Sequence, residues 1–459
     1  MFFKPQPIHF TGIGGIGMSG LAEVLLEMGY RVTGSDLKLS SVTERLTRLG
    51  AIVYQGHAAT NIAGANAIVV TSAARPDNPE IVEARRRGIP VIPRGELLAE
   101  LMRLKYGIAV GGSHGKTTTT SMVASILTHA GLDPTVVVGG LSATMRGSNA
   151  RIGKSDYLVV ESDESDGSFL KLSPILAVVT NIDREHLDHY ADLNQILAAF
   201  TDFVNKVPFY GAAILCVDDE NVQRILPLVK RRMITYGANA QADLRISHAS
   251  AGHLASEFRL SRDAQDLGTF RIHVPGAHNI SNAAAAAAIA LELDIPVDAI
   301  REGLAQFSGV DRRFQIKGCE RGVTVIDDYG HHPTEVRATL EAARACNYAK
   351  VHVLFQPHRY TRTQALMDEF ARAFHQADTV HVLDIYAASE APIEGVSSQA
   401  LVDRLRAYGD HGASYAATMD AGVSAVCDAA GSGDAIITLG AGSVSQAGPA
   451  ILNQLRSAR

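Results

Sequence analysis

The chain has 459 residues, 46% of them hydrophobic and 20% charged, and 42 Lys and Arg nearly balance 48 Asp and Glu. This length is enough for about three domains, each with its own core. No block of five basic residues occurs, and charged residues interrupt every apolar run. The sequence therefore argues against a nucleic-acid-binding or membrane-spanning protein.

The N-terminal segment and the cysteines bear on location. The segment MFFKPQPIHF lacks the features of a secretory signal peptide. The cysteines Cys216, Cys319, Cys346 and Cys427 are far apart and form no Cys-x-x-Cys pair. Reduced thiols are typical of cytosolic proteins, so we expect a cytoplasmic protein.

Apolar strands alternate with helical stretches along the chain, which predicts parallel α/β sheets. The first domain is expected at residues 1–105, with strands at 8–10, 31–33, 52–54, 67–70 and 91–92. The second is expected at 106–311, with strands at 108–110, 157–160, 177–180 and 213–217, an antiparallel piece at 244–274 and a close-packed helix over the six alanines 283–288. The third is expected at 312–459, with strands at 323–326, 351–355, 379–383 and 435–439.

A glycine-rich turn follows the first predicted strand. Gly12, Gly14 and Gly17 form the pattern GxGxxG, and Asp36 lies 19 residues beyond Gly17 at the end of the second strand. Glycines let the backbone approach a diphosphate, the helix N-terminus attracts its charge, and the acid can reach a ribose or base. The motif predicts a nucleotide or diphosphate ligand without separating NAD from a nucleotide sugar. A tight strand–helix turn without a ligand is the alternative.

A second glycine-rich turn, GGSHGKT at residues 111–117, follows the strand at 108–110. The strict GxxxxGK[ST] pattern requires Gly at position 110, which is Val110, so the match is a shortened variant. Backbone N–H groups here can surround phosphates, Lys116 can neutralise their oxygens and Thr117 can ligate Mg²⁺. The motif predicts an ATP site, and a turn with an exposed lysine is the alternative.

Acidic residues follow the strand at 157–160 in the sequence ESDESD, which begins at Glu161. Ligands of parallel α/β sheets bind at the carboxyl ends of strands, and Mg²⁺ prefers oxygen ligands. A solvated acidic loop is the alternative when the segment is taken alone. Because it follows a phosphate-binding turn in the same domain, the metal-binding interpretation is favoured.

Three further polar motifs follow strands. His186 lies in NIDREHLDH, where it could bind a cation, although a lone loop histidine is more often only solvated. Asp328 and His331 lie in DDYGHHPTE; adjacent histidines do not point together, so substrate contact is favoured over zinc. Arg359 and Arg362 lie in QPHRYTRT and form a fork for a carboxylate or phosphate, with surface charge as the alternative. Polar motifs at strand ends in all three domains indicate one shared cleft.

Taken together, the motifs resemble those of the Mur ligase family over essentially the whole chain. In order they read GIGGIGMSG, SD, TSAA, GGSHGKTTT, ESDESD, NIDREHLDHY, GAHNISNA, RRFQ, DDYGHHPTE, FQPHRYTRT and GAGSVSQ. The resemblance implies a three-domain α/β protein: a Rossmann-like N-terminal domain for a UDP substrate, a central P-loop ATPase domain with a mostly parallel sheet, and a Rossmann-like C-terminal domain. That last domain would take the amino acid and close over the cleft.

DDYGHHPTE and ESDESD are similar to the alanine-adding branch of this family. The resemblance implies a ligase of peptidoglycan synthesis that uses ATP and Mg²⁺. The lactyl carboxylate of UDP-N-acetylmuramate would attack the γ-phosphate of ATP, and the amine of L-alanine would displace phosphate from the acyl phosphate. We expect a monomer or homodimer with no nucleic-acid or membrane partner.

The resemblance also implies roles for individual residues. Those for ATP are Gly112, Ser113, His114, Gly115, Lys116, Thr117, Thr118, Asn279, Asn282, Arg313 and Asp328. Those for the UDP substrate are Gly14, Gly15, Ile16, Gly17, Ser35, Asp36 and Ser72, and those for the amino acid are His331, Arg359 and Arg362. The metal ligands would be Thr117, Glu161 and His186, and the catalytic residues Lys116, Glu161, His186, Asp328 and His331.

Two positions depart from the family pattern. Ser113 stands where the family usually has threonine, which keeps the hydroxyl. Several relatives carry a carbamylated lysine where this chain has Thr201, 15 residues after His186, so no carbamate bridge between metals is expected. The sequence DREHLDHY around His186 differs from the more common acidic pattern, so the second metal site is less defined than the first.

Three other functions remain open from the sequence. A recycling ligase that attaches a preformed peptide to the same muramate would share nearly every motif. A dinucleotide-dependent oxidoreductase with an accessory ATPase domain would use GxGxxG and Asp36, but would leave the C-terminal motifs without a role. A non-catalytic nucleotide-binding regulator would not need the set Lys116, Thr117 and Glu161.

Overall fold

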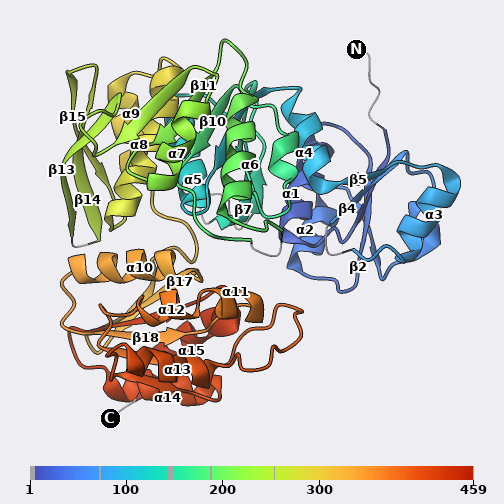
Figure 1. The fold of residues 1–459 in the computed structure, drawn as a ribbon. Coiled ribbons are helices and arrows are strands. Elements are labelled where there is room, and N and C mark those ends of the chain that lie inside the picture. The colour runs from blue at the N-terminus through green and yellow to red at the C-terminus, as the bar shows by residue number, and fades with distance from the viewer. Residues whose placement is uncertain (1–5, 72–73, 143–147, 187–188, 253, 458–459) are drawn as a thin grey trace. The chain divides into compact units, whose positions relative to one another are not determined.

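The computed structural model describes residues 6–71, 74–142, 148–186, 189–252 and 254–457. The chain divides into two compact units (Figure 1). Unit 1 comprises Met1–Arg245 and Ala284–Gly303, and unit 2 comprises Ile246–Ala283 and Leu304–Arg459. The predicted α/β class with mostly parallel sheets is confirmed. Within the described part of the chain, no helix has the length and apolar character needed to span a bilayer.

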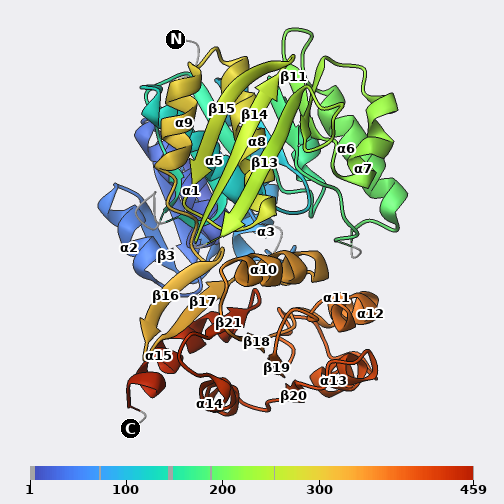
Figure 2. The same cartoon turned by 90° about the vertical axis from the view of Figure 1, so that its left-hand side faces the viewer.

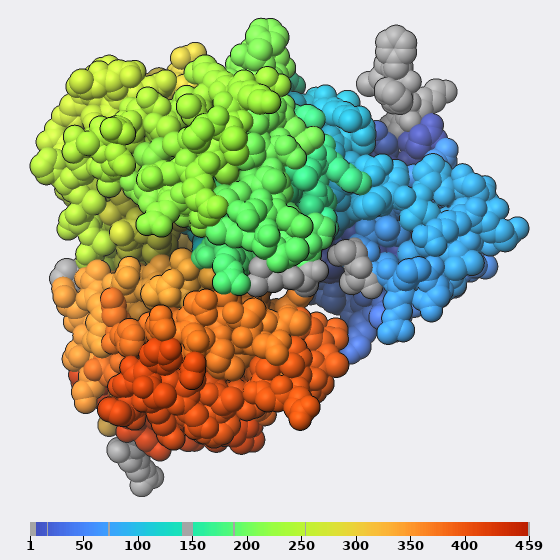
Figure 3. Space-filling view, viewed as in Figure 1, coloured from blue at the N-terminus to red at the C-terminus, as the bar shows by residue number. Residues whose placement is uncertain are grey.

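The first sheet of unit 1 is fully parallel, with the order β3-β2-β1-β4-β5. Its strands are β1 (Ile8–Thr11), β2 (Val32–Asp36), β3 (Ile52–Gln55), β4 (Ala67–Val70) and β5 (Val91–Pro93). Its helices are α1 (Ile16–Glu27), α2 (Ser41–Arg48), η1 (Ala59–Ile62), α3 (Pro79–Arg87) and α4 (Arg94–Met102). Blue marks the surface of these N-terminal residues in the space-filling view (Figure 3).

Local sequence explains the bounds of α3. Asn78 caps the helix by accepting a hydrogen bond from the backbone N–H of Glu80 at 2.9 Å, and Pro79 occupies the first helical position. Three arginines in the last turn face the negative end of the helix dipole, and Gly88 ends the helix with a φ of +70°. These signals fix the position of Glu80 in the first turn.

The central sheet of unit 1 runs β12-β11-β10-β6-β9-β7-β8, and only β7 and β8 pair antiparallel. Its strands are β6 (Tyr106–Gly111), β7 (Thr135–Ser142), β8 (Ser148–Arg151), β9 (Tyr157–Glu161), β10 (Leu176–Val179), β11 (Ala212–Cys216) and β12 (Met233–Gly237). Helix α5 (Lys116–His129) contacts β6, β7 and β9, whereas α6 (Leu193–Asn205) contacts β10 and α7 (Glu220–Ile225) contacts β11 (Figure 1).

Helices α8 (Ala277–Glu292) and α9 (Val297–Ala305) follow the polar strands. All six alanines from Ala283 to Ala288 in α8 are buried, as the sequence predicted. Gly303 in α9 packs directly on α5, because a Cβ there would lie 2.6 Å from the Cα of Ile126. Small residues thus permit close helix packing in unit 1.

Unit 2 contains most of the predicted antiparallel piece and the C-terminal sheet. Strand β13 (Leu244–Gly252) starts beside β12 through Leu244 and Arg245, and β14 (Ala255–Arg262) and β15 (Gln265–Ile272) form an antiparallel hairpin (Figure 2). The C-terminal sheet has the order β16-β17-β21-β18-β19-β20, with only β16 antiparallel. Its strands are β16 (Gln315–Glu320), β17 (Val323–Asp328), β18 (Val351–Phe355), β19 (Thr379–Val382), β20 (Ala413–Tyr415) and β21 (Ala435–Leu439).

The C-terminal sheet separates two hydrophobic cores, as in a doubly wound fold. Helices α10 (Pro333–Ala345), α12 (Met367–Ala371) and α13 (Ser398–Ala407) contribute to one core. Helices α14 (Met419–Ala429) and α15 (Ala447–Ser457) contribute to the other. The short elements are α11 (Tyr360–Ala365), η3 (Ser168–Lys171) in unit 1, η4 (Leu226–Leu228) in unit 1 and η5 (Ser443–Gln446).

Candidate active site

Lys116 lies at the start of α5, after the turn that follows β6. Gly112 and Gly115 have φ values of +123° and +82°, which favour glycine. The Lys116 Nζ donates to the carbonyl of Gly112 at 2.6 Å and pairs with the Glu164 carboxylate at 2.9 Å. Burial opposes the charged form, but Glu164 and other carboxylates nearby raise the pKa of Lys116 well above its ordinary value. The lysine is therefore a fixed positive charge.

The loop after β10 holds this turn in place. The carbonyl of His114 accepts hydrogen bonds from Thr180 Oγ1 at 2.6 Å and Asn181 Nδ2 at 3.0 Å, and the N–H of His114 donates to Asn181 Oδ1 at 2.8 Å. The backbone N–H of Asp183 donates to Ser113 Oγ at 2.8 Å, and the Asp183 carboxylate lies 3.0 Å from His114 Nε2. This glycine-rich turn is thus shaped by a second loop.

Oxygen ligands lie beside Lys116. Glu161, at the end of β9, accepts hydrogen bonds from Thr117 Oγ1 at 2.9 Å and from the backbone N–H of Gly139 at 2.7 Å. The structure therefore brings together the predicted pair Thr117 and Glu161. Hydroxyl and carboxylate oxygens are the ligands that Mg²⁺ prefers, so the donor set fits this ion.

His186 lies in a different acidic group. In the part of the chain that the structure describes, its ring nitrogen and one oxygen each of Glu164 and Glu185 lie within 4.8 Å of one another. Burial lowers the pKa of His186, but the hydrogen bond to Glu164 and the charge of Glu185 outweigh it and raise that pKa above the ordinary value. The carboxylates around His186 are therefore Glu164, which belongs to the ESDESD segment, and Glu185, which was not among the expected ligands. Residues 187–188 lie outside the described part.

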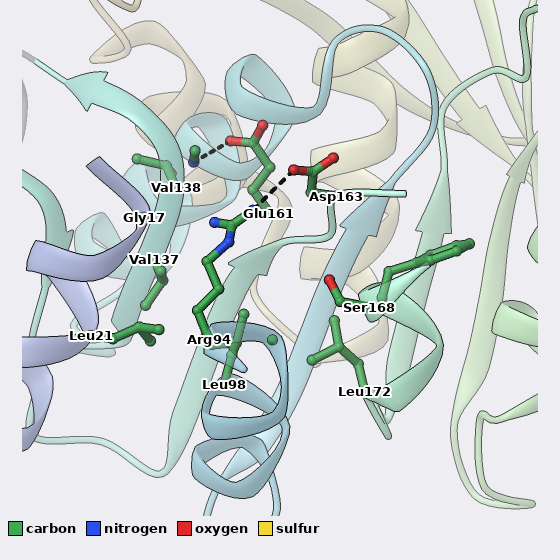
Figure 4. Close-up of a pocket in the computed structure, with 13 residues that line it drawn as sticks. Gly17, Leu21, Arg94, Leu98, Val137, Val138, Glu161, Asp163, Ser168 and Leu172 are labelled. Carbon is green, nitrogen blue, oxygen red and sulfur yellow. Dashed lines mark hydrogen bonds and ion pairs between the residues drawn. The ribbon is translucent and has the colours of Figure 1, made fainter. Parts of the chain in front are cut away.

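A pocket of about 160 Å³ in unit 1 is lined by residues of α1 and α4 on one side and of β7, β9 and η3 on the other (Figure 4). Its polar lining includes Glu161, Asp163, Ser168 and Arg94, and its apolar lining includes Leu21, Leu98, Val137, Phe169 and Leu172. Gly17 from the first glycine-rich turn also borders it. Figure 4 shows the Arg94 side chain reaching across the pocket to Asp163, with which it pairs at 3.2 Å.

The first glycine-rich turn is supported by carboxylates. The Asp36 carboxylate accepts a hydrogen bond from the N–H of Gly14 at 2.9 Å. Ser35 is fully buried and donates to Glu80 at 2.7 Å, so its hydroxyl faces the interior of the domain. Gly15 caps α1, which begins at Ile16. The side chain of Ile16, and Ser72 altogether, lie outside the described residues.

Glu80 is a buried acid that the sequence analysis missed. Its carboxylate is fully buried and accepts hydrogen bonds from Thr11 Oγ1 at 2.8 Å and Asn61 Nδ2 at 2.8 Å, besides the one from Ser35. Burial opposes ionisation, but the contact with His9 and the hydrogen bonds from Asn61 and Ser35 outweigh it and lower the pKa of Glu80 to about 2.

In unit 2, the predicted adenine and inter-domain residues lie at the start of α8 and beside β17. Asn279 and Asn282 are buried, and Asn279 Nδ2 donates to the carbonyl of Pro275 at 2.7 Å. Asp328 accepts hydrogen bonds from the N–H groups of Phe314 and Gly330, both at 2.7 Å. Burial raises the pKa of Asp328 although Arg313 opposes the shift. Arg313 itself pairs with Glu335 at 3.2 Å.

The predicted amino-acid residues partly converge on His358. The rings of His331 and His358 lie 5.9 Å apart, and Arg362 Nη1 lies 3.2 Å from Nδ1 of His358. Burial and the neighbouring positive groups lower the pKa of His358 to about 3, so the ring is neutral at physiological pH. Arg359 instead pairs with Glu390 at 3.8 Å and has a φ of +71°, which is unusual for a residue other than glycine.

Several site residues were not predicted, and they differ in whether the sequence around them could have indicated a role. Glu185 adjoins His186 in sequence, and His358 belongs to QPHRYTRT, so both were within quoted motifs. Glu80 and Arg94 lie at helix starts far from any motif, and only their tertiary contacts reveal them. Asp183 could have been found because it lies in the loop with His186.

Comparison with known proteins gives a consistent result. Residues 7–106, 110–290 and 312–442 match the domains described as "Mur ligase family, catalytic domain", "Mur ligase middle domain" and "Mur ligase, glutamate ligase domain". The UDP-N-acetylmuramate–L-alanine ligase of Solibacter usitatus is 67% identical over 457 residues, which cover 100% of this chain and 97% of the relative. The corresponding ligase of Acidobacterium capsulatum is 57% identical over 458 residues, which cover 100% of this chain and 99% of the relative.

Solved structures agree with this relationship. The UDP-N-acetylmuramate-alanine ligase from Thermotoga maritima superposes with a TM-score of 0.82 at 29% identity, covering 99% of this chain and 100% of that one. A murein peptide ligase from Psychrobacter arcticus has a TM-score of 0.71 at 23% identity, covering 99% of each chain, and shows the shared fold. The chain belongs to the Mur ligase family and has its three-domain α/β fold.

Proposed function

We propose that the chain is an ATP-dependent ligase that joins L-alanine to the lactyl carboxylate of UDP-N-acetylmuramate and releases ADP and phosphate. The observation that carries the proposal is full-length identity of 67% to a relative with this activity in its name. The arrangement around Lys116 supports it, because a fixed cation at a glycine-rich turn is the machinery of phosphoryl transfer. This reaction is a step of peptidoglycan synthesis, and we place it in the cytoplasm, where ATP is supplied.

The reaction has two chemical steps. The lactyl carboxylate attacks the γ-phosphorus of ATP, and the bond to the leaving ADP oxygen breaks, which gives an acyl phosphate. The uncharged amine of L-alanine then attacks the acyl carbon; phosphate leaves, and the nitrogen loses a proton to give the amide. Lys116 stabilises the negative charge of the transferring phosphoryl group. The turn formed by Gly112, Ser113, His114 and Gly115 holds the phosphates through backbone N–H groups.

Mg²⁺ fits the oxygen ligands of Thr117 and Glu161, and Glu164, Glu185 and His186 form a second cation-compatible group. When bound, the ion supplies neutralisation of the phosphate oxygens. Glu164 also pairs with Lys116 at 2.9 Å, so the lysine and this second group are in direct contact.

The remaining expectations form part of the proposal. The turn from Gly14 to Gly17, with Asp36, takes the diphosphate and nucleoside of the UDP substrate. Asn279, Asn282, Arg313 and Asp328 serve the nucleotide, and His331, Arg359 and Arg362 receive L-alanine. Boundaries near residues 105 and 312 separate the three domains.

Phosphate release tests the proposal. The purified chain is incubated with ATP, Mg²⁺ and UDP-N-acetylmuramate, with L-alanine, with the tripeptide of murein recycling, or with neither. Release that requires L-alanine is the expected result. Release with the tripeptide and not with L-alanine would instead identify a recycling ligase. Absence of release in all three mixtures would contradict both activities, and NAD binding would then test an oxidoreductase.

A further inference from the structure

Arg94 lies where three helices begin. It is the first residue of α4, and its guanidinium lies so close to Gly17, in the first turn of α1, that a methyl group on Gly17 would overlap Nη1. Gly95 packs in the same way against Ser168, the first residue of η3. All four residues line the pocket of Figure 4.

This arrangement concentrates positive potential at one place. The first turns of α1 and α4 carry the positive ends of their helix dipoles, and their first backbone N–H groups have no partner within the helix. A guanidinium beside a helix N-terminus is electrostatically unfavourable unless an anion lies near both. The anion that Arg94 meets in the structure is the carboxylate of Asp163, at 3.2 Å.

Asp163 has a second cation nearby. Burial disfavours its ionised form, but Lys116 and then Arg94 act against burial, and the pKa of Asp163 is held below its ordinary value. The carboxylate also accepts a hydrogen bond from the N–H of Ser165 at 3.0 Å, so it stays in place without Arg94. The pair is partly exposed, with 30% of the Arg94 side chain and 40% of the Asp163 side chain accessible, so a ligand can compete for the guanidinium.

We propose that Arg94 binds the diphosphate of the UDP substrate, and that Asp163 holds the guanidinium only while this site is empty. The inference rests on the proposed function and adds a residue from α4 to the glycine-rich turn. A guanidinium matches phosphate oxygens through two parallel hydrogen bonds, which the turn's backbone N–H groups complement. When the substrate binds, its diphosphate replaces the Asp163 carboxylate beside Arg94. The positive charge of Arg94 near two helix N-termini is therefore always balanced by an anion.

Isothermal titration calorimetry without ATP tests the proposal, with UDP-N-acetylmuramate and with UDP as separate ligands. Arg94→Gln should weaken both by about 10- to 100-fold, the range for hydrogen bonds to charged groups, and Arg94→Lys by less. Asp163→Asn should tighten binding of both, since the competing carboxylate is gone. Lys171→Gln is the matched control, because Lys171 pairs with Glu96 across the same elements, η3 and α4, at an exposed position. It should bind like the wild type.

The possible outcomes distinguish a failure of the role given to Arg94 from a failure of the proposed function. If the wild type binds both ligands and the variants Arg94→Gln and Arg94→Lys bind them with the same affinity, the role of Arg94 is overturned and the proposed function stands. A loss for UDP-N-acetylmuramate and not for UDP overturns the diphosphate assignment, because the guanidinium would then bind the carboxylate. Weaker binding in Asp163→Asn overturns the exchange. A wild-type chain that binds neither ligand overturns both proposals. Thermal unfolding of each variant ensures that a binding loss is not a folding loss.

Discussion

The two glycine-rich turns of unit 1 have the same local form and different sources of charge. Each follows a buried parallel strand and leads into a helix, α1 or α5. The turn before α5 contains its own cation, Lys116, within the motif. The turn before α1 contains none, and the guanidinium beside it comes from Arg94, 77 residues after Gly17 in sequence.

The two turns also differ in what supports them. Thr180, Asn181 and Asp183 hold the second turn from a neighbouring loop through backbone and side-chain hydrogen bonds. The first turn is supported by Asp36 on Gly14 and by Glu80, which accepts from Thr11, the residue just before Gly12. Each glycine-rich turn thus depends on residues outside its motif, and which residues these are cannot be read from the motif.

The largest effect is expected from Lys116, whose removal should slow the reaction without affecting the other glycine-rich turn. Lys116→Ala should lower kcat for phosphate release by at least about 10²- to 10³-fold, because it removes charge that stabilises the transferring phosphoryl group. Binding of UDP-N-acetylmuramate should be retained, since the proposed site of that ligand is at the other turn. Steady-state kinetics and calorimetry measure the two quantities, with the exposed Lys154→Ala as the control. Undiminished turnover would show that the second turn is not the ATP site.

This contrast explains which parts of the fold and of the candidate site could be predicted from the sequence. Strand, turn, helix and Lys116 lie within about ten residues, so their local pattern predicted both the element and its chemistry. The α/β class followed in the same way from alternating apolar strands. Glu80 and Arg94 act through contacts with residues 19 to 77 positions away, and nothing in their local sequence distinguishes them from surface charges. The sequence could not assign Glu164 to His186, because pattern alone does not show which carboxylate of ESDESD turns toward it, and Glu185 lies outside that segment.

The support of the first turn predicts a pH-dependent stability. A pKa of about 2 for Glu80, against an ordinary 4.5, corresponds to about 3 kcal/mol of stability. Because the folded pKa is lowered, this contribution is present above pH 4.5 and is lost as the pH falls toward 2. Glu80→Gln should therefore lower the free energy of unfolding at pH 7, and the difference from wild type should shrink below pH 4.5.

Urea denaturation at several pH values measures this difference. Glu83→Gln is a suitable control, because Glu83 is on the same helix and pairs with Arg86 and Arg87 at the surface. It should change the stability little. A Glu80→Gln variant as stable as wild type at pH 7 would mean that the buried carboxylate is not ionised in the folded chain.

Glycine substitutions should distinguish the backbones of the two turns. Gly112 has a φ of +123° and a Cβ there would lie 2.9 Å from the backbone nitrogen of Thr180, so Gly112→Ala should strain the turn and cost at least about 1–2 kcal/mol. Gly17→Ala would meet mainly the flexible end of Arg94. We expect it to preserve stability and weaken UDP binding. Thermal unfolding of both variants should show that Gly112→Ala is less stable than Gly17→Ala. Equal destabilisation of the two variants would contradict this expectation.

The smallest expected effect concerns the support of the second turn. Asp183→Asn removes the charge facing His114 Nε2 but keeps the backbone hydrogen bond to Ser113, so the loop should retain its path. The weaker contact of the neutral amide with His114, a difference of about 1 kcal/mol, should raise the KM for ATP by about fivefold and leave kcat and UDP binding nearly unchanged. Asp192→Asn, which alters only the cap of α6, is the control. If Asp183 acts through His114, then His114→Ala should abolish the effect of Asp183→Asn in a double-mutant cycle, because the carboxylate would have nothing left to orient. Additive effects would mean that Asp183 acts on the ATP site independently of His114, so that the second turn, like the first, would depend directly on a charged side chain outside its motif.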